Sequence, residues 1–215
     1  MFARDYRQAA WNALKGKWGT MVVMFLIYGA ITAACGIIPT VGSIAAIIIG
    51  GPLAIGFYGA TLKVIRGEQP EVVDLFDGFK NNFTNALLLT FLNGLFIVLW
   101  SLLLVIPGII KALSYSMSYF ILAENPGMSQ ADARRASMVM MEGNKWRLFC
   151  LELSFIGWAI LSGLTAGILS LWVTPYMYTA VAAFYEDLKA QQAPVVQPAP
   201  VEAVPEVAPA ETIGE

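Results

Sequence analysis

The sequence predicts an all-α protein, a polytopic transmembrane helix bundle of about six spans in three hairpin repeats, with interfacial amphipathic helices. Three observations predict this class. Hydrophobic residues make up 58% of the 215 residues and charged residues only 13%, against about 25% charged in soluble proteins. Apolar stretches close to the roughly 20 residues of a spanning helix recur along the chain. The basic residues fall almost entirely between alternate stretches.

The chain opens with an expected interfacial helix over residues 2–15. Phe2, Tyr6 and Leu14 share one helical face with several alanines, while charged and amide side chains take the other. Lys17 and Trp18 follow and predict an anchor at the headgroup level. A collar that anchors the first span is the simpler interpretation of this helix, and a sensor of anionic lipid is the alternative.

Six apolar segments then predict the spans, at about residues 19–38, 43–64, 84–105, 108–123, 148–166 and 168–185. Pro52, Pro107 and Pro175 each fall early in an even-numbered span, where proline lacks the amide hydrogen that continues the helical ladder. We therefore expect kinks or breaks there. The fourth span is short, which indicates tilt, local thinning of the bilayer or partial burial in protein.

The polar segments complete a membrane domain of residues 1–189. Residues 63–83 mix charges of both signs and should lie in water. Residues 129–142 predict a cytoplasmic elbow helix with Ser129 as its N-cap, and Lys145 and Trp146 then repeat the basic-aromatic anchor. Residues 190–215, rich in alanine, proline and glutamate, predict a disordered cytoplasmic tail.

The distribution of basic residues predicts the topology. With six spans, twelve of the 13 lysines and arginines fall on one side and Lys111 alone on the other. Short loops rich in lysine and arginine face the cytoplasm. Both termini of this multi-pass protein should therefore be cytoplasmic, in the cytoplasmic (plasma) membrane.

An internal repeat accounts for the spacing of these features. Placing Gly16 over Gly143, with one inserted residue, aligns Lys17-Trp18 with Lys145-Trp146. Each of three units would hold an amphipathic approach, an anchor, an outgoing span and a proline-bearing return span. Three independent helix breakers are the alternative explanation of the prolines.

Polar residues inside the apolar stretches are the candidate site residues. Lys111, Ser114, Tyr115 and Ser118 recur at helical spacing and should face the bundle, toward Asn93 in the third span. A transport path or a lipid-headgroup site is the functional interpretation, and interhelical hydrogen bonding is the structural one. Glu152 should pair with Lys145 or Arg147 near the interface.

Enzymatic chemistry is not expected. The chain has no histidine, the commonest metal ligand and general base, and it has no glycine-rich phosphate loop. We predict no catalytic residues, no cofactor and no metal site. The net charge of −2 without a basic surface argues against a nucleic-acid partner. The expected partners are membrane lipids and another membrane protein or a second copy of the chain.

Several segments carry a family resemblance. They are I-P-G-I-I-K-A-L-S-Y-S-M, I-L-A-E-N-P, K-W-R-L-F-C-L-E-L-S-F-I-G-W, A-A-F-Y-E-D-L, G-G-P-L and R-G-E. The chain resembles, over roughly residues 1–190, an uncharacterised bacterial integral-membrane family of unknown function that is common in Gram-positive bacteria. It is more distantly similar to the membrane domain of some glycerophosphodiester phosphodiesterases, without their catalytic domain. The resemblance implies a polytopic bundle in the bacterial cytoplasmic membrane and no established activity.

The function expected from these features is a non-catalytic membrane scaffold or modulator of an envelope component. The alternative is a small transporter or channel for a solute, peptide or lipid, because proline-broken helices often mark transport sites.

Overall fold

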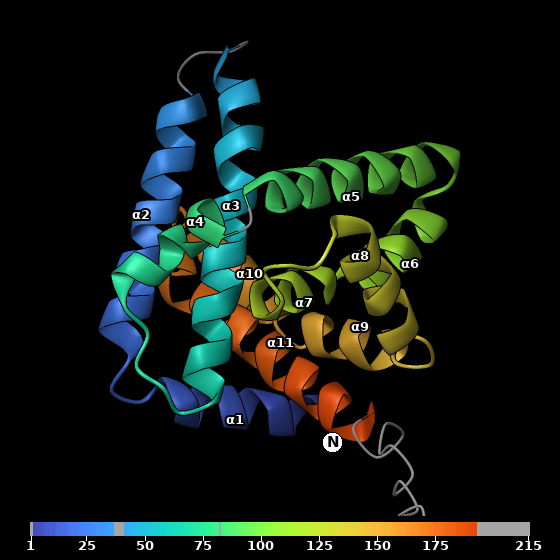
Figure 1. The fold of residues 1–215 in the computed structure, drawn as a ribbon. Helices are drawn as coiled ribbons and strands as arrows, with labels where there is room; N and C mark the ends of the chain where they lie inside the picture. The colour runs from blue at the N-terminus through green and yellow to red at the C-terminus, as the bar shows by residue number, and fades with distance from the viewer. Residues whose placement is uncertain (1, 37–40, 82, 193–215) are drawn as a thin grey trace, which may run out of the picture.

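The computed structural model describes residues 2–36, 41–81 and 83–192, and these are helical without a strand. Figure 1 shows the arrangement. The helices in chain order are α1 (Ala3–Leu14), α2 (Trp18–Gly36), α3 (Val41–Ile65), the 3-10 helix η1 (Val72–Phe76), α4 (Asp77–Asn81), α5 (Phe83–Leu103), α6 (Val105–Tyr115), α7 (Ser118–Glu124), α8 (Gln130–Met140), α9 (Lys145–Leu153), α10 (Ile156–Leu164) and α11 (Ser170–Gln192). The predicted tail lies outside the described residues, apart from its first three.

Within the described residues, five segments are long and apolar enough to cross a membrane, as expected of a membrane protein: Trp18–Cys35, Ile48–Ile65, Phe83–Leu102, Val105–Glu124 and Lys145–Leu164. The predicted sixth span, residues 168–185, falls in α11, which is not among the five. Glu186, Asp187 and Lys189 in its last third make α11 more polar than the others. Its crossing of the membrane stays a prediction.

The proline-bearing helices differ in where the helix is interrupted. Pro52 lies inside a continuous α3 and Pro175 inside a continuous α11. Pro107 lies in the first turn of α6, where a missing amide hydrogen costs least. The fourth span is instead divided after Tyr115, between α6 and α7, and the fifth is divided between α9 and α10.

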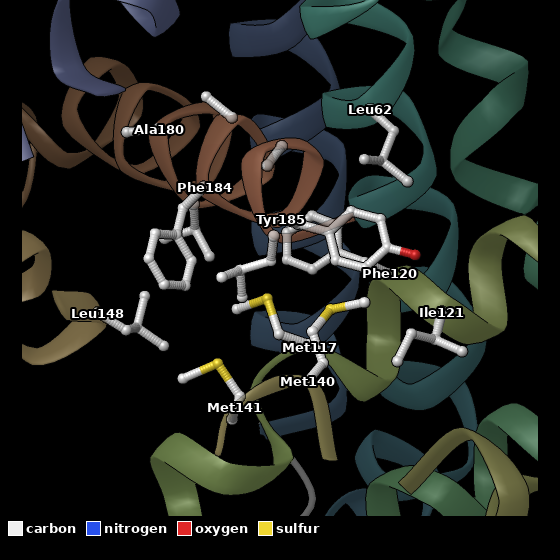
Figure 2. Packing of buried hydrophobic residues seen from close by; sticks show 14 of the residues in the cluster. Leu62, Met117, Phe120, Ile121, Met140, Met141, Leu148, Ala180, Phe184 and Tyr185 are labelled. Carbon is white, nitrogen blue, oxygen red and sulfur yellow. The ribbon is translucent and has the colours of Figure 1, made fainter. Parts of the chain in front are cut away.

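The core surrounds the second half of α11, whose residues from Thr179 to Tyr185 are all buried. Figure 2 shows Phe184 and Tyr185 of this helix packed among side chains from α3, α7, α8 and α9. The Tyr185 ring stacks on that of Phe120 with centroids 5.2 Å apart. Burying such aromatic side chains is the main stabilising contribution in a core. α11 is therefore the element around which the others pack.

The apolar face of α1 lies against protein. Tyr6, Ala10 and Leu14 are buried at the helical spacing that the sequence predicts. They face α11 along most of the length of α1, and the Tyr6 ring meets that of Phe184 edge-on at 5.3 Å. α1 thus attaches the N-terminus to the central helix.

Two helix pairs extend away from this core. In Figure 1 the pair α2–α3 and the pair α5–α6 point in different directions, with α5 running across α3. Only 11% of the candidate span Trp18–Cys35 in α2 and 17% of the candidate span Phe83–Leu102 in α5 are buried. At the junction of α5 and α6, Leu102, Leu104 and Ile106 are exposed, and Leu164 and Ile168 are exposed between α10 and α11. These surfaces are apolar enough to contact lipid.

The elbow helix has the predicted start. The hydroxyl of Ser129 accepts a hydrogen bond from the amide of Asp132 at 3.2 Å, and it donates to the Asp132 carboxylate at 2.7 Å. Gly143 follows the helix with φ of +76°, and Gly16 follows α1 with φ of +81°. A glycine in the left-handed conformation thus follows each helix. Gly16 directly precedes Lys17-Trp18, and Gly143 is separated from Lys145-Trp146 by one residue.

Candidate functional site

The ends of three helices meet in an ionic cluster, which we call the Arg66 cluster. Arg66 follows α3 and contacts Glu124 at the end of α7, and it donates to Glu186 of α11 at 2.6 Å. Lys189 and Tyr185 also bind Glu124, at 2.8 and 2.6 Å. Glu124 is 11% exposed and receives three partners, so its charge is compensated. The cluster holds α3, α7 and α11 together.

A second cluster links α1, α9 and α11. Arg147 donates to Asp187 at 2.8 Å and to the Tyr6 hydroxyl at 2.5 Å, and that hydroxyl donates to Asp187 at 2.5 Å. Burial, together with the hydrogen bond to Asp187, raises the pKa of Tyr6 to about 12. Burial alone would raise the pKa of Asp187, but hydrogen bonds from Tyr6, Arg147 and Gln191 outweigh it and lower that pKa.

The polar residues predicted to face the bundle, Asn93, Lys111, Ser114, Tyr115 and Ser118, are divided between the core and the extending α5–α6 pair, which we call the α5–α6 arm. Asn93 is 1% exposed and its amide nitrogen donates to the Ser118 hydroxyl at 3.0 Å. Ser118 donates to the carbonyl of Tyr115 at 2.5 Å, and Ser114 donates to that of Ile110 at 2.7 Å. Ser114, Tyr115 and Ser118 are buried, as the helical spacing predicts. The structure therefore brings Asn93 and Ser118 together.

Lys111 lies apart from this group. Its ammonium sits 5.2 Å from the ring centroid of Trp100, on the α5–α6 arm. That contact is a cation–π interaction, which holds the charge beside an exposed indole. Trp100 lies two turns beyond Asn93 along α5, so Lys111 contacts a different part of that helix from Ser118.

The predicted anchors also differ from one another. Lys17 is 7% exposed, and its ammonium approaches the carbonyl of Val64 at 3.4 Å, near the negative end of the α3 dipole. Trp18 packs edge-on against Trp11 at 5.3 Å. Trp146 is 71% exposed, and Lys145 opens α9 beside it. The second anchor therefore reaches outward, whereas Lys17 is used inside the fold.

Glu152 does not form the predicted ion pair with Arg147, because Arg147 is already bound to Asp187 and to Asn144. Lys145, the other expected partner, has no ion pair with Glu152 in the described part of the chain. The Glu152 carboxylate instead lines a groove of about 480 Å³ between α9–α10 and α11.

A tyrosine pocket was not predicted. It has a volume of about 390 Å³ and lies between α2, α3, α5, α7 and α11. Its wall holds four tyrosines and two threonines: Tyr28, Tyr58, Tyr119, Tyr178, Thr32 and Thr90. Tyr58 stacks on Tyr119 at 5.0 Å and meets Tyr178 edge-on at 5.2 Å. These residues are too far apart in sequence for any local spacing to reveal them. Their only signal is a polar aromatic residue in each of four apolar stretches.

The polar groups in the wall of this pocket are mainly hydroxyls. The Tyr58 and Tyr178 side chains lie close enough to interact, and so do those of Tyr119, Thr90 and Asn93. The side-chain oxygens of Thr90 and Asn93 are buried and have no well-formed hydrogen bond. Such oxygens can accept a hydrogen bond from a small polar group. None of the described residues that line this pocket carries a charge.

A tryptophan pocket of about 390 Å³ lies between α1, α2, α10 and α11. Four of the six tryptophans line it: Trp11, Trp18, Trp158 and Trp172. Tyr176 completes the wall and meets the ring of Trp11 edge-on at 5.7 Å. Tryptophan is the side chain that prefers the boundary between lipid and water. An aromatic wall of this kind is typical of side chains at that boundary.

One comparison with known proteins finds a match. A family model described as "Protein of unknown function (DUF975)" matches residues 1–114 and 102–192. No curated protein and no solved structure matches the chain.

Proposed function

The chain belongs to the DUF975 family of proteins of unknown function, and from that premise we propose that it is a non-catalytic membrane scaffold or modulator of an envelope component. The proposed setting is a bacterial cytoplasmic membrane, with six spans and both termini in the cytoplasm. The likeness to the membrane domain of glycerophosphodiester phosphodiesterases stays a prediction.

The observation that carries the proposal is the use of the polar side chains near the centre. Asn93 donates a hydrogen bond to Ser118, and Ser114 and Ser118 each donate one to a backbone carbonyl. Arg66 and Lys189 together neutralise Glu124 and Glu186. Such contacts stabilise one arrangement of helices, whereas a solute path needs polar groups that are free to bind and release. The side-chain oxygens of Thr90 and Asn93 are the exception, and they support the second candidate below.

The three-hairpin interpretation is also part of the proposal. Gly16 and Gly143, which the repeat places over each other, both end a helix in the left-handed conformation. The return helices α3, α7 and α11 meet at the Arg66 cluster. Three return helices that are joined at one ionic cluster suit a module that holds its cytoplasmic helices in fixed positions.

The face of α8 is the surface that we assign to the partner. Arg135 is exposed, and Val139, one turn further, is 65% exposed on the same side of the helix. We choose this face because the sequence predicts α8 in water and Val139 is its exposed large apolar side chain among the described residues.

The experiment places a photo-crosslinking residue at Val139 in cells that make the protein, with Leu99 on the α5 arm as the matched exposed position. We expect one discrete protein adduct from Val139 and lipid adducts from Leu99. Adducts of the same mixture at both positions would contradict the scaffold role.

A transporter for a small polar solute is the second candidate, and the tyrosine pocket favours it. The test reconstitutes the protein into liposomes and measures uptake of proton, sodium, potassium and labelled amino acids. Flux that is lost with Asn93→Leu and Tyr119→Phe but kept with Lys111→Leu would support this candidate against the scaffold.

A further inference from the structure

The groove between α9–α10 and α11 has a wall that is mainly apolar. Phe155, Ala159, Val173 and Met177 are among its lining residues, and its volume is about 480 Å³. An alkyl chain of about ten carbons would bury its apolar surface in a groove of this size. On the α9–α10 side, Leu153, Ile156 and Ile160 are apolar and exposed, so we expect a chain to enter the groove sideways from the membrane on that side.

Glu152 is the charged residue of this wall. It lies inside the candidate span Lys145–Leu164, two turns beyond Lys145. Arg147 is bound to Asp187, and the Arg7 guanidinium lies over the Phe155 ring, 5.4 Å from its centroid. Among the described residues no cation stands within ion-pair distance of the Glu152 carboxylate.

A carboxylate inside a membrane segment is unfavourable unless a proton or a cation compensates it. The fold supplies no cation there, and the groove beside it accepts a chain.

We propose that this groove binds an amphiphile with a primary amine, with its ammonium group on Glu152 and its alkyl chain along Phe155, Ala159 and Met177. Charge complementarity selects the amine and the apolar wall selects the chain. The site is independent of the scaffold role, because α8 and its exposed face do not line the groove.

The test titrates dodecylamine into the full-length protein in phosphatidylcholine nanodiscs by isothermal calorimetry, with empty nanodiscs subtracted for partitioning into lipid. Dodecanol, which has the same chain without the charge, is the matched ligand. We expect dodecylamine to bind Glu152→Gln about tenfold or more weakly than the wild type, because a desolvated charge pair is lost. Dodecanol should bind both proteins equally and weakly.

Two further variants separate the charge from the cavity. Glu142→Gln removes an exposed cytoplasmic carboxylate and should leave amine binding unchanged. Ala159→Phe fills the groove while keeping Glu152 and should weaken the binding of both ligands. Equal amine affinity in the wild type and Glu152→Gln would overturn the proposal, as would full amine binding by Ala159→Phe. A melting temperature equal to the wild type's in the same nanodiscs verifies the folding of each variant.

Discussion

Single residues around α11 decide how the ends of the helices are joined. Asp187 receives hydrogen bonds from Tyr6, Arg147 and Gln191, which come from three different helix segments. Glu124 receives bonds from Arg66, Tyr185 and Lys189. Charge-assisted hydrogen bonds of this kind are about twice as strong as neutral ones. These two carboxylates are therefore the most sensitive single positions outside the apolar core.

Replacing Asp187 with asparagine should destabilise the protein at neutral pH, because the Arg147 guanidinium loses its carboxylate partner. The lowered pKa of Asp187 means that its contribution is complete above about pH 4, the usual value for an unfolded aspartate, and is lost as the pH falls through the lower folded-state pKa. The difference in melting temperature between wild type and variant in detergent should therefore be largest near pH 7 and shrink below about pH 4.

Glu142→Gln is the control for that measurement, since Glu142 is exposed and its side chain takes part in no contact of this cluster. A difference that stays constant down to pH 2 would show that Asp187 acts through its shape and not through its charge.

Replacing Arg66 with glutamine should lower the free energy of unfolding by about 1–2 kcal/mol, because Glu124 and Glu186 lose their shared cation while Arg66 itself is 36% exposed. Arg135→Gln removes an arginine that is 78% exposed and should cost less than about 0.5 kcal/mol. Unfolding followed by sodium dodecyl sulfate titration measures both. Equal losses of unfolding free energy in the two variants would show that the Arg66 cluster does not stabilise the fold.

At the scale of the elements, the polar segment after α3 folds back onto that helix. A Cβ built on Gly56 would collide with the backbone of Leu75 and Asp74, and one on Gly78 would collide with that of Pro52. Gly56 and Ala60 predict a close helix approach from the sequence. The structure provides that approach with η1, a short 3-10 helix. Lys63 then binds Asp74 at 2.7 Å and ties the segment to α3.

Gly56→Ala should therefore displace η1 and lower the free energy of unfolding by about 1–3 kcal/mol, despite the higher helix propensity of alanine. Gly59→Ala, one turn away on the same helix, would place its Cβ 3.8 Å from that of Ala123 and should be neutral or stabilising. Limited proteolysis of residues 66–82, together with the melting temperature, distinguishes the two. Equal resistance to protease in both variants would show that η1 does not depend on this contact.

The two ionic clusters of the molecule lie apart from its exposed apolar junctions. Arg66, Glu124, Arg147 and Asp187 lie in the two clusters around the second half of α11. The junctions of α5 with α6 and of α10 with α11 are apolar and exposed. Because charges and hydrocarbon are solvated differently, we expect this separation to orient the molecule in a membrane.

Single cysteines in a cysteine-free background test that orientation. A cysteine in place of Arg135 should react with a membrane-impermeant maleimide only after the cells are permeabilised. Cysteines in place of Leu104 and Leu164 should react from the outside of intact cells. Labelling of Arg135→Cys from the same side as Leu104→Cys would refute the six-span topology.

Local patterns account for much of what the sequence predicted correctly. Helical class, the apolar segments and the Ser129 cap all depend on residues within one or two turns of each other. The same periodicity marks the apolar face of Tyr6, Ala10 and Leu14, but not that this face packs on α11. Within such short distances the helical repeat decides which side chains share a face, so periodicity is sufficient.

Tertiary structure alone decided the partners of the charged and polar side chains. Arg147 binds Asp187, 40 residues away, in place of nearby Glu152, and Arg66 binds Glu186 at a separation of 120 residues. The tyrosine pocket likewise gathers residues from five helices. Local periodicity carries no information on such contacts, because they depend on how whole helices pack, and that packing is determined by the shape of the buried surfaces together.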